Sequence, residues 1–140
     1  MRETHPVAVA ELNVARALVE AIVARQVGRA ADLLHPEIDF RAMTPNRVWE
    51  AEGREGVETI LRQWFEDPDE EIHRIEATET VAIEDTLRVG WLVHISDADG
   101  PHVFEQQAYV RERDGRVGWL RVMCSGWIPL GDPSAQAPTA

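Results

Sequence analysis

The chain of 140 residues contains no lysine, and its 14 basic residues, all of them arginine, are outnumbered by 25 acidic ones. The formal charge of -11 repels the phosphate backbone of nucleic acids, and no segment concentrates arginine as a nucleic-acid-binding surface does. We therefore expect no nucleic-acid partner. The excess of acidic residues is typical of a solvated surface that keeps a protein soluble.

Cysteine is nearly absent too, because Cys124 is the only one in the chain. It cannot form an internal disulfide, and the sequence has no clustered His and Cys at zinc-site spacing, so we expect neither a metal nor another cofactor. No apolar run approaches the roughly 20 residues that cross a bilayer, which excludes a membrane span. Residues 1–6 have no basic start, and no unbroken apolar core follows them as in a signal peptide, so we expect a cytoplasmic protein.

A chain of this length can form one stable domain without disulfide bonds or a bound metal ion. Apolar residues recur at helical spacing in two segments, which predict amphipathic helices over 9–27 and 54–66. A shorter helix is predicted over 30–34, separated from the first by Gly28 and stopped by Pro36.

Extended segments make up most of the remaining chain. A small hairpin is predicted over 38–52, and four longer strands are predicted over 72–83, 86–96, 102–113 and 116–127. The order ααββαββββ predicts an α+β domain in which the helices cover one face of a curved antiparallel sheet. We expect this domain over residues 9–128, between a flexible start, 1–8, and a flexible tail, 129–140.

Four stretches, taken together in their order and spacing, resemble a known family: Val27-Gly28, Leu33 to Phe40, Glu52 to Val57 and Arg113 to Val117. They are similar to the SnoaL-like branch of the nuclear transport factor 2-like superfamily, which includes polyketide cyclase and ketosteroid isomerase-like domains. The resemblance implies a cone-shaped fold whose sheet wraps around a pocket closed by the helices. It implies no single activity, because this fold hosts isomerases, cyclases, dehydratases, epoxide hydrolases and plain binding proteins.

Strand alternation sorts the side chains of the predicted sheet onto two faces, and the more apolar set belongs inside. With one stripe of the 54–66 helix, this set predicts a pocket lined mainly by hydrocarbon and indole. The predicted ligand-binding residues are Phe40, Leu61, Trp64, Trp91, Phe104, Gln106, Val122 and Cys124. The alternative for Trp64 and Trp91 is that they simply fill the cone. Gln106 distinguishes better between ligand contact and core filling, because a buried amide needs hydrogen-bond partners.

The opposite face of the predicted sheet carries an apolar patch mixed with arginine. Its members are Leu92, Tyr109, Trp119 and Met123, with Arg111 and Arg121 among them. Exposed patches of this kind usually mark an interface. We expect a homodimer packed through the outer sheet face, as the family resemblance also implies. The alternative is that the C-terminal tail covers the patch.

Acidic residues are missing where the resemblance places catalytic ones. In the positions of the tyrosine, the base and the second acid of ketosteroid isomerase-like members, the chain has Ala21, Ala42 and Ala108. Val122 takes the place of the aspartate of the cyclase and limonene epoxide hydrolase relatives, and no Asp or Glu occurs in 117–126. The resemblance therefore assigns no catalytic residue.

Other titratable candidates for the pocket are His35, Asp39, His94, His102 and Cys124. We expect His35 to satisfy the last carbonyls of a helix and Cys124 to be a buried, inert thiol. His94 is expected on the outer face of the sheet, unless its strand is flipped and places it in the pocket as a base.

Three functions are left open by the sequence. A protein that binds a hydrophobic small molecule is favoured by an apolar pocket without the acids of its enzymatic relatives. The alternative is a cyclase, isomerase or dehydratase acting on a polyketide- or steroid-like substrate, with His94, Asp39 or Gln106 in unfamiliar roles. The third is a dimeric interaction scaffold that works through the outer sheet face.

Overall fold

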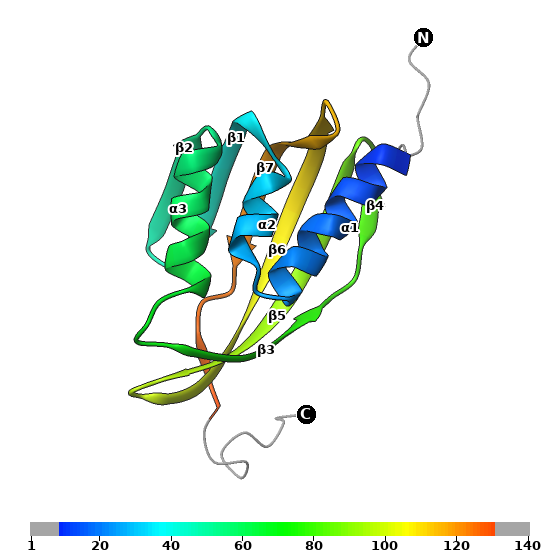
Figure 1. Ribbon diagram of the computed structural model, residues 1–140. Coiled ribbons are helices and arrows are strands. Elements are labelled where there is room, and N and C mark those ends of the chain that lie inside the picture. The colour runs from blue at the N-terminus through cyan, green and yellow to red at the C-terminus, as the bar shows by residue number, and fades with distance from the viewer. Residues whose placement is uncertain (1–8, 131–140) are drawn as a thin grey trace.

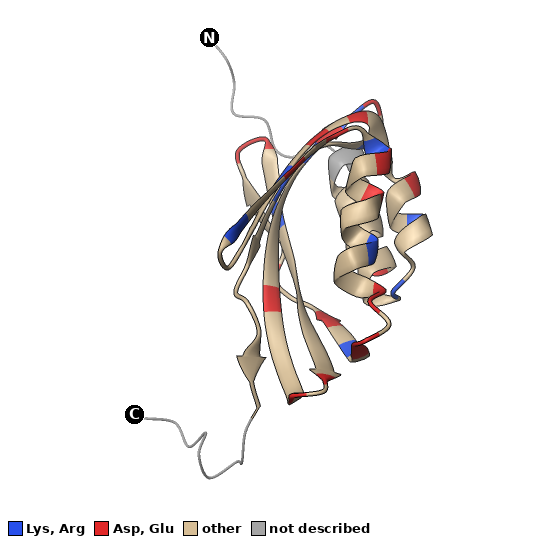
Figure 2. Ribbon diagram, turned by 90° about the vertical axis from the view of Figure 1, so that its left-hand side faces the viewer, with Lys and Arg blue, Asp and Glu red and all other residues tan. Residues whose placement is uncertain are grey.

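A computed structural model describes residues 9–130, in which three helices lie against the concave face of a curved sheet (Figures 1 and 2). The helices are α1 (Val9–Val23), α2 (Val27–Asp32) and α3 (Arg54–Phe65). The strands are β1 (Leu34–Thr44), β2 (Arg47–Glu52), β3 (Glu71–Ala77), β4 (Val81–Ile83), β5 (Thr86–Asp97), β6 (Gly100–Arg113), β7 (Arg116–Cys124) and β8 (Ile128–Pro129). The predicted α+β class, with helices on the concave face, is confirmed. The predicted flexible ends lie outside the described residues, apart from Pro129 and Leu130.

The sheet runs in the order β2-β1-β7-β6-β5-β3, while β4 pairs with β5 and β8 pairs with β6. Neighbouring strands are antiparallel except β1 and β7, which are parallel. The predicted antiparallel sheet is therefore correct except where the first long strand meets the last one. This pairing places Phe40 beside Leu120 and Ala42 beside Val122.

The core lies between the helices and the concave face of the sheet. Helix α1 contributes Leu18 and Ile22, and α3 contributes Val57 and Leu61. Along β5, β6 and β7 buried side chains alternate with more exposed ones, so the predicted choice of inner face is confirmed. None of the helices within 9–130 is long and apolar enough to cross a membrane.

The break between the first two helices lies at Arg25 and not at Gly28, which is inside α2. Arg25 has a φ of 59°, and its backbone N–H donates to the carbonyl of Ile22 at 2.9 Å. Its guanidinium donates to the carbonyl of Ile72 at 2.6 Å. This contact with β3 ties the left-handed turn to the sheet, which the helical spacing of apolar residues does not reveal.

The second helix ends earlier than predicted, and Leu34 already belongs to β1. The carbonyl of Leu33 accepts a hydrogen bond from the N–H of Val117, the second residue of β7, at 2.8 Å. Pairing with β7 therefore overrides the helical tendency of the predicted 30–34 segment.

Two predicted strands are interrupted in the structure. The 72–83 segment divides into β3 and β4, both paired with β5, and between them the Thr78 N–H donates to the carbonyl of Gly90 at 2.9 Å. Gly90 is required there, since a Cβ on it would lie 2.4 Å from Thr78 Oγ1. The last predicted strand ends at Cys124, and the chain turns at Gly126 with a φ of 79° before β8.

Candidate functional site

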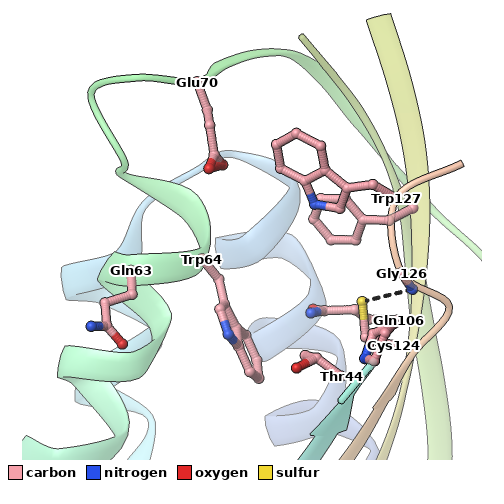
Figure 3. A pocket seen from close by; sticks show the side chains of 10 residues that line it. Thr44, Gln63, Trp64, Glu70, Gln106, Cys124, Gly126 and Trp127 are labelled. Atoms are coloured by element: carbon pink, nitrogen blue, oxygen red, sulfur yellow. Dashed lines mark hydrogen bonds between the residues drawn. The ribbon is translucent and has the colours of Figure 1, made fainter. Parts of the chain in front are cut away.

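A cavity of about 290 Å³ lies between the C-terminal end of α3 and strands β1, β6 and β7 (Figure 3). The residues that line it are Thr44, Pro45, Gln63, Trp64, Glu70, Phe104, Gln106, Cys124, Gly126 and Trp127. Most of them are apolar or uncharged, and Glu70 is the only ionisable carboxylic acid among them.

The predicted ligand-binding set divides equally between this cavity and the core. The members that line the cavity are Trp64, Phe104, Gln106 and Cys124. The members that fill the core are Phe40, Leu61, Trp91 and Val122, each 3% exposed or less. The second group packs within the core cluster, and none of its side chains lines this cavity.

Gln106 occupies the middle of a row across three strands, with Trp91 of β5 on one side and Cys124 of β7 on the other. The indole N–H of Trp91 donates to Gln106 Oε1 at 2.8 Å, which fixes the amide. Gln106 is 1% exposed, and its amide nitrogen makes no hydrogen bond within residues 9–130. Figure 3 shows this side chain pointing into the cavity. The amide therefore presents two N–H donors that a ligand can use.

Trp64 forms one wall of the cavity near the end of α3 (Figure 3). Three aromatic rings pack against it, and their centroids lie 6.1 Å (Phe40), 5.7 Å (Trp49) and 6.4 Å (Phe65) from the ring centroid of Trp64. Its indole nitrogen is buried and has no hydrogen-bond partner among the described residues. Because that nitrogen is shielded, Trp64 offers a ligand its hydrocarbon surface.

Trp127 lies across the cavity from Trp64 and stacks on Phe104, with ring centroids 6.4 Å apart and planes 3° from parallel. The turn at Gly126 brings it there. A Cβ on Gly126 would lie 2.5 Å from Pro45 Cγ, and its φ of 79° already disfavours other residues. A glycine is therefore needed to place this tryptophan, which the predicted continuous strand over 116–127 did not anticipate.

Glu70 follows α3 in an acidic turn and points between Trp64 and Trp127 (Figure 3). Burial raises the pKa of Glu70 from 4.5 to about 7, helped by the charge of Asp67, a side-chain hydrogen bond with it, and the charges of Asp97 and Asp69. The Asp67 carboxylate also accepts the N–H of Asp69 at 2.8 Å, which shapes the turn. Sequence reasoning missed Glu70, although an acidic run directly after an aromatic helix end was a usable signal.

No protein-family model matches the chain, and no curated protein matches it. Solved structures match over most of its length. A nuclear transport factor 2-like protein of unknown function from Mesorhizobium loti is 18% identical, with a TM-score of 0.67 over 87% of this chain and 98% of that one. The chain has the nuclear transport factor 2-like fold.

Two further structures share this fold. A proposed isomerase from Rhodopseudomonas palustris is 18% identical, with a TM-score of 0.61 over 86% of this chain and 93% of that one. An LEH-like epoxide hydrolase from M. tuberculosis is 12% identical, with a TM-score of 0.63 over 86% of each chain. At such low identity these similarities show the nuclear transport factor 2-like fold alone.

Two titratable candidates lie on the outer side of this nuclear transport factor 2-like sheet. His94 Nε2 is 3.1 Å from a carboxylate oxygen of Glu76, and this hydrogen bond, with the charge of Arg74, lowers the pKa of Glu76. The strand of His94 is therefore not flipped. The Asp39 carboxylate accepts a hydrogen bond from Arg121 at 3.2 Å.

The other candidates also have local roles. His35 does not end a helix, which corrects the prediction: it lies in β1, and its Nδ1 accepts the N–H of Glu37 at 2.9 Å. His102 packs against Trp127 with ring centroids 5.0 Å apart. Cys124 is not fully buried, which corrects the prediction: it is partly exposed, it lines the cavity, and its sulfur accepts the N–H of Gly126 at 3.4 Å. Within residues 9–130, no three His, Cys, Asp or Glu side chains are grouped to hold a metal ion.

Proposed function

We propose that the protein binds a flat, mainly apolar small molecule in this cavity and orients it through Gln106. The amide of Gln106 carries this proposal, because Trp91 fixes its oxygen and leaves its nitrogen free at the cavity surface. At the cavity surface, a hydrogen bond from this nitrogen to a ligand contributes roughly 0.5–1.5 kcal/mol. A ligand with a carbonyl oxygen or a ring nitrogen acceptor would supply the missing partner.

The size and walls of the cavity support a ligand of one or two rings. Trp64 and Trp127 present aromatic surfaces from opposite sides (Figure 3). Its volume of about 290 Å³ lies at the lower limit of small-molecule sites, which span roughly 300–1,000 Å³. Most of the affinity would come from apolar burial, at about 25 cal/mol per Å². A bicyclic ligand suits this space better than a tetracyclic, steroid-like one.

An enzyme is the second candidate function, since the fold relatives include a proposed isomerase and an epoxide hydrolase. Ala42, Ala108 and Val122 stand where the family resemblance places catalytic acids, and all three are buried in the core. A reaction in this cavity would therefore need a different acid, and Glu70 is the one that lines it.

Titration with 5-nitroindazole, a flat bicyclic compound with ring nitrogens, tests the binding proposal. We expect saturable quenching of tryptophan fluorescence and slower alkylation of Cys124 by iodoacetamide, because the bound ring covers the sulfur. Cys124 is the only cysteine, so mass spectrometry reports its modification alone. In a control carrying Ala82→Cys on the exposed part of β4, alkylation of residue 82 should not change. Linear quenching with unaltered Cys124 alkylation would contradict the proposal.

We also propose that two copies associate through the outer face of the sheet. Met43 lies opposite Val48 on β2 and beside Met123 on β7, and the three are 52%, 61% and 48% exposed. Among the apolar members of the predicted patch, only Met123 is exposed, while Leu92, Tyr109 and Trp119 are half-buried. Trp119 is half-buried between two arginine side chains whose guanidinium carbons lie 4.0 and 4.4 Å from its ring centroids. An apolar row beside a covered tryptophan supports an interface between identical copies.

Sedimentation equilibrium tests this association. We expect a mass of two 15.8 kDa chains for the unchanged protein. Met123→Asp should shift the equilibrium to single chains, because a dimer would bury two unpaired carboxylates. A mass of one chain at every concentration of the unchanged protein would rule the dimer out.

A further inference from the structure

We propose that Glu70 acts as a base toward the molecule bound in this cavity, taking a proton from carbon while negative charge develops near Gln106. The proposal rests on the binding function proposed above and adds a chemical step to it. Its substrates are planar carbon acids, in which loss of a proton leaves a delocalised anion. No residue matching the catalytic positions of the resembled family takes part.

The geometry places an acid and hydrogen-bond donors around one small space. Glu70 enters from the turn after α3, and Gln106 enters from β6 on the sheet side (Figure 3). Gln106 is almost fully buried and its amide nitrogen has no partner within 9–130, so its donors are directed at whatever fills the cavity. A base on one side and fixed donors on the other are what proton removal beside an electron-accepting group requires.

The charged surroundings of Glu70 favour a base that works near neutral pH. The groups that face it are Asp67 and Asp69 in its own turn, Asp97 of β5, and Arg25 and Glu66, which line an adjoining cavity of about 200 Å³ that Glu70 also lines. Arg25 donates to the carbonyl of Ile72 at 2.6 Å, so it is held by the backbone of β3. Glu66 is paired with Arg62 at 2.7 Å. Burial first, and then the nearby acidic groups, therefore hold the pKa of Glu70 high, as described above.

Asp67 has a positioning role in this arrangement. It is hydrogen-bonded to Glu70, and its charge is the second contribution to the raised pKa after burial. Replacement by asparagine removes that charge but keeps an oxygen that can accept the N–H of Asp69, as Asp67 does at 2.8 Å. The variant Asp67→Asn therefore changes the electrostatics and preserves the shape of the turn.

Elimination of 5-nitrobenzisoxazole measures such a base directly. The carboxylate of Glu70 takes the proton from C3, the electrons of that C–H bond form the nitrile, and the N–O bond breaks. The electron pair of the broken bond stays on oxygen, which gives 2-cyano-4-nitrophenolate, a coloured product that Gln106 can stabilise by a hydrogen bond. No oxidant or second reactant is needed. The absence of lysine from the chain removes side-chain amines as competing bases.

The test compares two variants with the unchanged protein by the absorbance of this product, after subtraction of the buffer rate. Glu70→Gln should lower kcat/KM about 100-fold or more, because the base is lost while size and polarity remain. The matched control, Glu71→Gln, changes the next residue, whose side chain is 77% exposed and outside the cavity lining, and should leave the rate unchanged. A Glu70→Gln rate equal to that of the unchanged protein would overturn the proposal.

The pH profile separates a base from a structural residue. The unchanged protein should gain activity as pH rises, with an inflection near pH 7, the pKa of Glu70, because only ionised Glu70 accepts the proton. In Asp67→Asn the inflection should move to lower pH, since a negative neighbour is gone. A profile that Asp67→Asn does not move would contradict the assignment. Saturable binding of 5-nitroindazole without any Glu70-dependent elimination would overturn the proton transfer alone, whereas absence of binding would overturn the binding function as well.

Discussion

Phe40→Ala will lower the free energy of unfolding by about 3–5 kcal/mol, the range for a buried aromatic residue cut back to alanine. Phe40 is 1% exposed on β1, where it packs in the core and against the ring of Trp64. The measurement is denaturation by urea followed by circular dichroism. Phe40→Leu is the control and should lose less than half as much, because leucine fills most of the space.

This result decides between core and pocket for one member of the predicted ligand-binding set. If Phe40 lined an open cavity, its ring would lack packing partners on one side and its removal would cost little. A loss below about 1 kcal/mol would therefore contradict the core assignment of Phe40.

Trp127→Ala will have the opposite pattern, with a large effect on binding and a small one on stability. Trp127 is 37% exposed, so its truncation should change the free energy of unfolding by less than about 1 kcal/mol. It forms a wall of the cavity, and the loss of ring stacking should weaken 5-nitroindazole binding by about tenfold. The titration described above measures this affinity.

Ile128→Ala is the matched control for this prediction, because Ile128 is 51% exposed and does not line the cavity. We expect its affinity for 5-nitroindazole to equal that of the unchanged protein. Equal affinities for Trp127→Ala and Ile128→Ala would show that the ligand sits elsewhere.

The sequence predicted the inner face of the sheet because a strand has a strict period of two. Alternation places Trp91, Gln106 and Cys124 on one face, and the structure aligns them across β5, β6 and β7. However, alternation does not reveal whether an inward-facing side chain packs in the core or lines a cavity. Whether an inward side chain meets the core or a cavity depends on how far α3 reaches along the sheet, and that is a tertiary property.

The residues that sequence reasoning missed lie where no periodicity applies. Glu70 stands in the turn between α3 and β3, and Trp127 stands after the turn at Gly126. The positions that the resembled family uses for catalytic acids hold Ala42, Ala108 and Val122. The acid that reaches this cavity, Glu70, comes from a loop, which the resemblance does not indicate.

A crystal structure with 5-nitroindazole bound would show directly whether the cavity between α3 and the sheet is the ligand site. We expect the ring between Trp64 and Trp127, with a ring nitrogen or nitro oxygen within hydrogen-bond distance of the Gln106 amide nitrogen and the Glu70 carboxylate at its edge. Density for the compound at any other place, with the cavity filled by protein side chains, would contradict it.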